Sequence, residues 1–228
     1  MEIYTETYTV SEEGLRTSAM FRLLQEISGH QSALVGRGQK DLAEKGLMWV
    51  VIRQIVELQR WPQPGERLLA RTWPGVTRHS MCPRYYRLET EAGELLLTGC
   101  AIWAVVDRET RKMILPSAYG VEIEPLVTGL ESRRPPAPAR GENTESGCFT
   151  VPEEVLDENG HMNNTRYYDL AEGFLGTPGR PLRAAVTEYI SEARLGDTLT
   201  LHWGGNGSHF TVEGSCGGPC FRMELQYE

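Results

Sequence analysis

Residues 9–15 read TVSEEGL, and residues 150–156 read TVPEEVL, so that five of the seven positions are identical. A second pair of matches follows in the same order, GERLLARTW at 65–73 and GDTLTLHW at 196–203. Short matches that recur in the same order indicate duplication of one structural unit. The chain is therefore predicted to contain two similar units, each large enough for a small core.

Hydrophobic spacing in the first half predicts one helix followed by antiparallel strands. Residues 17–35 place Met20, Leu24 and Ile27 on one helical face. Stretches rich in β-branched and aromatic residues follow and predict strands. They are 47–61, 65–74, and a pair within 79–107 that turns near Ala92 and Gly93.

The second half repeats this order after a change in composition. Residues 133–147, RRPPAPARGENTESG, are proline-rich and polar, which is typical of a linker. A helical pattern covers about 164–175, and strand patterns follow at 184–193, 197–204, 209–216 and 220–227. We predict an α+β chain with an N-terminal unit at 1–132, a linker at 133–147 and a C-terminal unit at 148–228.

Composition excludes several classes of protein. The net charge of −8 disfavours nucleic acid as a partner, because that role needs a broad basic face. No apolar run approaches the roughly 18 residues that span a bilayer, and the acidic start MEIYTETYTV lacks the order of a signal peptide. We expect a cytoplasmic protein without a membrane span.

The five cysteines are scattered, which argues against a secreted disulfide framework. Cys216 and Cys220 flank the turn Gly217-Gly218-Pro219, and we interpret CGGPC as a hairpin. A structural zinc site needs four ligands, and no second pair of cysteines is present. We expect neither a metal nor a cofactor.

The stretch VLDENGHMNNTRYYDLAEG, residues 155–173, contains the residues best suited to chemistry. Asp157, Asn159 and His161 alternate, which places them on one side of an extended segment. Imidazole moves protons near neutral pH, a carboxylate can orient it, and an amide can donate to an oxyanion. An asparagine at 163 or 164 would cap the helix that follows. The alternative is a capped polar turn with a surface histidine.

The repeat favours chemistry in one copy. When the register of 9–15 and 150–156 is continued, Asp157, Asn159 and His161 face Arg16, Ser18 and Met20, which carry no equivalent groups. Other catalytic motifs are missing from the sequence: no G-x-S-x-G, no H-E-x-x-H and no phosphate-binding glycine loop. Glu192 lies near the end of a predicted strand and could approach the stretch.

Several segments resemble the acyl-acyl carrier protein thioesterases of bacteria and plant plastids. They are LLQEISGHQSALVGRG (23–38), LMWVVIRQIVELQRWP (47–62), ARTWPG (70–75), AIWAVVDRETRKM (101–113) and DENGHMNNTRYYDLAE (157–172). The resemblance covers about residues 4–203, and D-x-N-x-H-x-N-N-x-x-Y is its most specific part. It implies two tandem hot-dog units, each a helix wrapped by an antiparallel sheet.

The resemblance also implies an activity, namely hydrolysis of fatty acyl thioesters on acyl carrier protein. It assigns catalysis to Asp157, Asn159 and His161, with Glu192 as a fourth member. Some members of the family carry a cysteine directly after that glutamate, where this chain has Ala193. We therefore expect Glu192, or a water that it activates with His161, to attack the thioester carbonyl. The missing transit peptide favours a bacterial over a plastid origin.

The acyl chain is expected in the N-terminal unit, which is the acyl-chain side of this family. Candidate walls are Met20, Leu24, Ile27, Met48 and Val50, and each of them also fits an ordinary core. An acidic carrier protein would need a local basic patch on this acidic chain. Arg108, Arg111 and Lys112 are the first candidates, followed by Arg133, Arg134 and Arg140.

Three other functions fit the same residues: a hot-dog acyl-CoA thioesterase, a hydroxyacyl-thioester dehydratase and a non-catalytic acyl-binding module. The sequence leaves open the acyl chain length, the choice between carrier protein and CoA, and the choice between direct attack and water. It also leaves the oligomeric state open, with a homodimer among the options.

Overall fold

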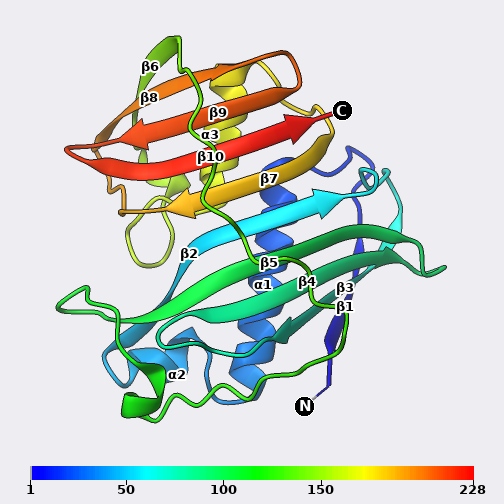
Figure 1. Ribbon diagram of the computed structural model, residues 1–228, viewed down its shortest axis with the longest axis vertical. Coiled ribbons are helices and arrows are strands. Elements are labelled where there is room, and N and C mark those ends of the chain that lie inside the picture. The colour runs from blue at the N-terminus through cyan, green and yellow to red at the C-terminus, as the bar shows by residue number, and fades with distance from the viewer. Residues whose placement is uncertain (1) are drawn as a thin grey trace. The chain divides into compact units, whose positions relative to one another are not determined.

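The computed structural model describes residues 2–228 (Figure 1). Residue 1, where the predicted N-terminal unit starts, lies outside the described residues. The chain forms two compact units. Unit 1 comprises the residues up to Leu15 together with Arg22–Pro135, and unit 2 comprises Arg16–Phe21 with Pro136–Glu228.

Unit 1 contains an antiparallel sheet in the order β1-β3-β4-β5-β2. Its strands are β1 (Tyr4–Thr9), β2 (Leu47–Leu58), β3 (Arg67–Pro74), β4 (Cys82–Thr90) and β5 (Leu95–Asp107). Helix α1 (Thr17–Leu34) contributes all but its first residues to this unit, and α2 (Gln39–Ala43) and the 3₁₀ turn η1 (Pro116–Tyr119) complete it.

Unit 2 contains a second antiparallel sheet, in the order β6-β8-β9-β10-β7. Its strands are β6 (Glu145–Thr150), β7 (Leu182–Tyr189), β8 (Thr198–Gly205), β9 (His209–Ser215) and β10 (Pro219–Tyr227). The 3₁₀ turn η2 (Glu153–Val155) and helix α3 (Arg166–Leu175) lie between β6 and β7 in the chain. The two sheets therefore have the same connectivity.

The sequence repeat corresponds to a repeated strand pairing. Thr9, in the first copy of the repeat, pairs with Arg67, while Thr150, in the second, pairs with Thr198. The next hydrogen bonds are also equivalent: Val10 N to Glu66 O and Val151 N to Asp197 O, each 2.9 Å. The predicted duplication is confirmed at the level of backbone register.

In each unit the helix lies against one face of the sheet (Figure 1). In unit 1 the Ser28 hydroxyl on α1 lies 2.9 Å from the Tyr86 hydroxyl on β4. In unit 2 the Tyr168 hydroxyl on α3 lies 2.7 Å from Thr187 Oγ1 on β7. These buried polar pairs satisfy hydroxyl groups that would otherwise weaken the helix–sheet cores.

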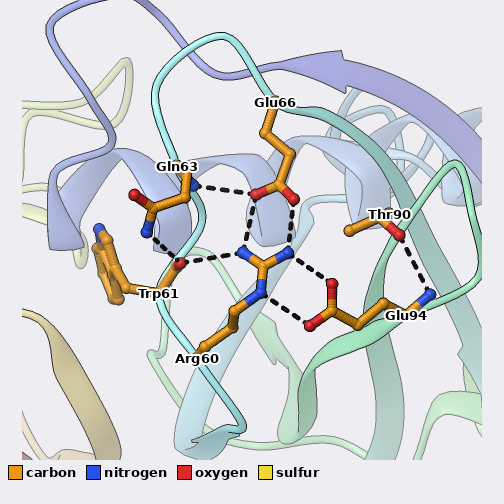
Figure 2. Close-up of polar contacts among 6 residues, drawn as sticks. All are labelled: Arg60, Trp61, Gln63, Glu66, Thr90 and Glu94. Carbon is orange, nitrogen blue, oxygen red and sulfur yellow. Dashed lines mark hydrogen bonds and ion pairs between the residues drawn. The ribbon is translucent and has the colours of Figure 1, made fainter.

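An arginine held between two glutamates joins the turns at one end of the unit 1 sheet (Figure 2). Arg60 binds Glu66 through Nη1 and Nη2 at 3.0 and 2.6 Å, and Glu94 through Nε and Nη2 at 2.8 and 2.7 Å. The hydrogen bonds from Arg60 hold the pKa of both carboxyls below the usual value. Backbone Gln63 N and the Thr90 hydroxyl complete the cluster.

Two strands and one short helix were not predicted. β1 and β6 are edge strands whose side chains alternate between exposed and half-buried, so they lack the apolar pattern of a central strand. The first residues of β6 belong to the stretch predicted as linker. Helix α2 has five residues, too few to show a hydrophobic period. Within residues 2–228, no helix is long and apolar enough to cross a membrane.

Candidate active site

Asp157 closes a tight turn that presents the histidine. Its Oδ1 accepts hydrogen bonds from backbone Asn159 N at 2.8 Å and His161 N at 3.1 Å. Backbone Asp157 N donates to His161 O at 2.8 Å, and Gly160 adopts a φ of +77°. A carboxylate that accepts two backbone donors fixes this loop, and the positive φ suits glycine.

The turn brings His161 against the segment that follows β7. His161 forms an antiparallel bridge with Arg194, and backbone Met162 N donates to Ala193 O at 2.8 Å. Nε2 of His161 lies 3.0 Å from Oε2 of Glu192. Only 11% of the His161 side chain is exposed, against 33% for Glu192, so the pair joins a buried imidazole to a solvent-accessible carboxylate.

Arg194 is a member of this group that was not predicted. Its Nη2 lies 3.6 Å from the same Oε2 atom of Glu192, and its side chain is 61% exposed. Residues two apart in an extended segment share a face. The spacing of Glu192 and Arg194 was therefore a signal that could have identified the arginine.

Asn159 belongs to the same turn as Asp157 and His161. Among the described residues 2–228, its side-chain amide makes no hydrogen bond, whereas its backbone is held by Asp157. The amide can therefore donate to a substrate oxygen without losing a partner inside the protein.

The predicted asparagine cap of the helix is corrected in detail. Thr165 is the N-cap residue of α3, and α3 starts at Arg166. Asn163 Oδ1 accepts hydrogen bonds from both Thr165 N at 2.9 Å and Thr165 Oγ1 at 2.8 Å. Asn163 thus orders the chain one turn ahead of the helix, because its side chain binds the residue two positions on.

The register that paired the trio with Arg16, Ser18 and Met20 is wrong. In the first copy of the repeat the helix begins at Thr17, two residues after Leu15. In unit 2 it begins at Arg166, ten residues after Leu156. The catalytic candidates therefore lie on a loop that is longer in the second copy. The contrast between copies arises from this insertion and not from replacement of side chains at matched positions.

The segment that carries Glu192 is fixed by the hairpin of Cys216 and Cys220. Backbone Ile190 N and Ser191 N both donate to Cys220 O, at 2.8 and 3.1 Å, and Ser191 Oγ donates to Pro219 O at 2.8 Å. β9 and β10 pair across this turn, which confirms the hairpin interpretation, and the five cysteines are free. The part of the chain that the structure describes contains no group of three His, Cys, Asp or Glu residues suited to a metal ion.

The candidate acyl-chain residues are distributed over two elements. Met20, Leu24 and Ile27 are buried on α1, Met48 is buried on β2, and Val50 on β2 is half-buried. Their burial fits both a core and the wall of an acyl site.

The candidate docking residues lie on the exposed turn after β5. Asp107 Oδ1 orders this turn by accepting hydrogen bonds from Thr110 N at 2.7 Å and Glu109 N at 3.1 Å. Arg108, Arg111 and Lys112 are exposed there, and Arg111 has a φ of +57°. Of the alternatives, Arg133 pairs with Glu57 at 2.9 Å, which leaves less free charge at that position.

Comparison with known proteins identifies the first part of the chain. Residues 3–115 match the family of the acyl-ACP thioesterase N-terminal domain. Residues 3–115 therefore belong to the acyl-ACP thioesterase family. The resemblance inferred from the sequence motifs is confirmed.

Curated members of the family match with modest identity. The chain is 26% identical over 148 residues to a chloroplastic palmitoyl-acyl carrier protein thioesterase of Gossypium hirsutum, covering 60% of this chain and 36% of that protein. It is 23% identical over 138 residues to a chloroplastic acyl-carrier-protein hydrolase of Cuphea viscosissima, covering 56% and 33%. The chain thus spans about a third of the length of these relatives.

Solved structures extend the likeness in fold to the whole chain. An acyl-ACP thioesterase from Bacteroides thetaiotaomicron aligns with a TM-score of 0.80 and 20% identity, over 99% of this chain and 98% of that one. The 12:0-ACP thioesterase from Umbellularia californica aligns with a TM-score of 0.79 and 20% identity, over 99% and 97%. The tandem hot-dog architecture is therefore that of acyl-ACP thioesterase structures.

Proposed function

We propose that this protein hydrolyses fatty acyl thioesters of acyl carrier protein and releases free fatty acid. The observation that carries the proposal is the 3.0 Å contact between His161 Nε2 and Glu192 Oε2, on a chain whose first part is a thioesterase family domain. An imidazole next to a carboxylate can accept a proton near neutral pH and pass it on. Thioester hydrolysis needs this step, because water must lose a proton as it attacks.

In the proposed mechanism each residue has a separate role. His161 and Glu192 activate the attacking water, and the thiolate leaving group regains a proton through His161. The Asn159 amide donates to the carbonyl oxygen as negative charge develops there. Asp157 acts as a positioning residue, because its carboxylate binds backbone N–H groups of the other two.

We infer water attack in preference to direct attack by Glu192. Oε2 of Glu192 faces both His161 at 3.0 Å and Arg194 at 3.6 Å. Positive charge and hydrogen bonding stabilise a carboxylate and so lower its nucleophilicity, while leaving it able to orient an imidazole. Ala193 supplies no thiol, so the chemistry runs without a cysteine nucleophile at that position.

We propose acyl carrier protein as the partner and Arg108, Arg111 and Lys112 as its docking residues. The acyl chain is proposed to lie in unit 1, against Leu24, Ile27, Met48 and Val50. Met20, at the start of α1, is the fifth candidate for contact with the acyl chain. The exposed basic turn supports the docking proposal because carrier proteins are acidic.

A homodimer is the assembly proposed for solution, and sedimentation velocity that yields only the mass of a monomer would overturn it.

A product assay on matched substrates tests the proposed function. The purified chain is given one saturated and one 3-hydroxy acyl group, each on carrier protein and on CoA. We expect free fatty acid as the product, with larger kcat/KM on carrier protein. An enoyl thioester would identify a dehydratase, preference for CoA would identify an acyl-CoA thioesterase, and binding without turnover would identify a non-catalytic module.

A further inference from the structure

A groove in unit 2 lies outside the candidate active site. It is an open groove with a volume of about 370 Å³, within the range of small-molecule sites. Its apolar lining comes from β6, η2, α3 and the residue after His161: Phe149, Val155, Met162, Leu170 and Phe174. Arg166 and Asp169 from the first turn of α3 are its charged members.

The groove and the candidate site lie on opposite sides of one extended segment. His161 and Met162 are consecutive, and both form antiparallel bridges, His161 with Arg194 and Met162 with Leu156. Consecutive side chains of an extended segment point to opposite faces. Met162 lines the groove, while the His161 imidazole faces Glu192. The groove is therefore a separate site that shares its wall with the catalytic pair.

The lining has the chemistry of an amphiphile with a negative head. Five apolar side chains form most of the surface, and a single cation, Arg166, stands among them. Arg166 is paired with Asp169 at 3.1 Å, and about 35% of each side chain is exposed. An ion pair this exposed is worth only about 0–1 kcal/mol, so a ligand carboxylate can compete for the arginine. The first turn of α3 adds a favourable dipole for an anion.

We propose that this groove binds a free fatty acid, with its chain over Phe149, Met162, Leu170 and Phe174 and its carboxylate on Arg166. The identity of this ligand as the product of the enzyme rests on the proposed function, whereas binding itself does not. Each methylene placed on the apolar lining adds to affinity, so longer fatty acids bind more tightly. A phosphate or a short carboxylate lacks this contribution.

A ligand bound in the groove would affect His161 and Glu192 through two short structural connections. Met162 follows His161 directly in the chain, and backbone Met162 N donates to Ala193 O, beside Glu192. A ligand that displaces the Met162 side chain therefore strains the two extended segments that hold the 3.0 Å contact. The groove acts as a product-inhibition site that is distinct from the substrate site.

Binding is tested by calorimetric titration of the His161→Ala protein with dodecanoate below its micelle concentration. This measurement does not require catalytic activity. Gly173→Leu fills the groove. Gly173 lies on α3 at the groove, and a Cβ there meets no atom within 4 Å, so the helix accepts the new side chain. We expect Gly173→Leu to weaken binding by about tenfold or more, since a filled apolar site excludes the chain.

Two charge variants should change the affinity for dodecanoate in opposite directions, which distinguishes this groove from any other apolar site. Arg166→Gln should weaken dodecanoate binding by about tenfold, because it removes a charge-assisted hydrogen bond. Asp169→Asn should tighten binding by about two- to threefold, because it frees Arg166. Arg183→Gln is the matched control. This exposed arginine lies on β7, at the other end of the strand order from β6, and its loss should leave binding as in the parent.

Two results would overturn the proposal: no binding by the parent, or binding that Gly173→Leu and Arg166→Gln leave unchanged. In turnover assays the variants are made in protein that retains His161, and the rate of each is compared with its own rate without dodecanoate. Dodecanoate should inhibit by a mixed or non-competitive pattern. Purely competitive inhibition would overturn the coupling to His161. If the protein hydrolyses no acyl thioester while the binding pattern holds, the proposed function fails and the groove assignment stands.

Discussion

The backbone N–H of His161 donates to Oδ1 of Asp157 over 3.1 Å, so this acid positions the main chain of the histidine. The same oxygen accepts a hydrogen bond from Asn159 N at 2.8 Å, so the backbones of both candidate residues depend on one acceptor. The ring of His161 is contacted by a different acid, Glu192. Orientation of the backbone and polarisation of the ring are thus divided between two carboxylates.

Replacing Asp157 should separate its hydrogen bonding from its charge. Asp157→Ala removes the shared acceptor, and a lost hydrogen bond to a charged group corresponds to roughly a 10- to 100-fold loss in kcat with little change in KM. Asp157→Asn keeps an oxygen acceptor in the same place and should retain most of the activity. Steady-state kinetics on acyl carrier protein thioesters measures both. Equal loss in the two variants would show that the charge matters and the turn does not.

Glu172 should make stability depend on pH. Burial raises its pKa to about 7, although the Thr17 hydroxyl donates to its Oε1 at 2.5 Å. The neutral form is therefore favoured in the folded state. Its contribution to stability is complete below the unfolded pKa of about 4.5 and is lost as the pH rises through about 7.

Glu172→Gln keeps an acceptor for Thr17 and removes the titration. Urea unfolding should show that the free energy of unfolding of the wild type falls between pH 4.5 and pH 8, by on the order of 2 kcal/mol from this residue. The variant should lack this decrease. Thr17→Val, which removes the donor but leaves the carboxyl, is the control and should keep the pH dependence. If the free energy of unfolding depends on pH in the same way in the wild type and in Glu172→Gln, the assignment of the pH dependence to Glu172 is wrong.

Charge reversal on the turn after β5 should distinguish carrier protein from CoA. Arg108→Glu, Arg111→Glu and Lys112→Glu together should lower kcat/KM on acyl carrier protein by about tenfold at low salt, because rim charges mainly set the association rate. Activity on the matched acyl-CoA should change much less, and the difference should shrink as salt rises. Reversal of Arg133, Arg134 and Arg140 provides the comparison patch. Equal losses on both substrates would remove the docking assignment.

Labelled water should report the attacking group. In a single turnover in ¹⁸O-water, water attack places the label in the fatty acid and leaves the Glu192 carboxylate unlabelled. Direct attack would form an anhydride, and water that then attacks the Glu192 carbonyl of that anhydride would leave label in Glu192. Mass spectrometry of the peptide that contains Glu192 detects this label, and its presence would overturn the water mechanism.

Most of the fold was predictable because the central strands and α1 carry strong hydrophobic patterns. The repeat was predictable from TVSEEGL and TVPEEVL, in which Val10 O and Val151 O accept equivalent hydrogen bonds from Gly65 N and Gly196 N. β1 and β6 were missed because an edge strand with one exposed face needs few apolar residues. The register of the second copy failed because the loop before α3 is longer, and loop length cannot be read from periodicity.

The candidate site was predictable only in part. Asp157, Asn159 and His161 share a spacing that predicts one face, and the structure places their backbone on one turn. The contact with Glu192 is set by tertiary structure, and the family resemblance supplied it. Arg194 could have been inferred from its spacing to Glu192. The groove at Met162 depends on how β6, η2 and α3 pack, which local sequence does not encode.

The most direct measurement of the central claim is a double-mutant cycle on His161 and Glu192 with an acyl carrier protein thioester. His161→Ala and Glu192→Gln should each lower kcat by about 10²- to 10⁴-fold, as loss of acid–base catalysis does. The double variant should be no slower than the worse single variant, because residues that act as a unit are not additive. Either variant at the wild-type rate, or losses that multiply, would contradict the account.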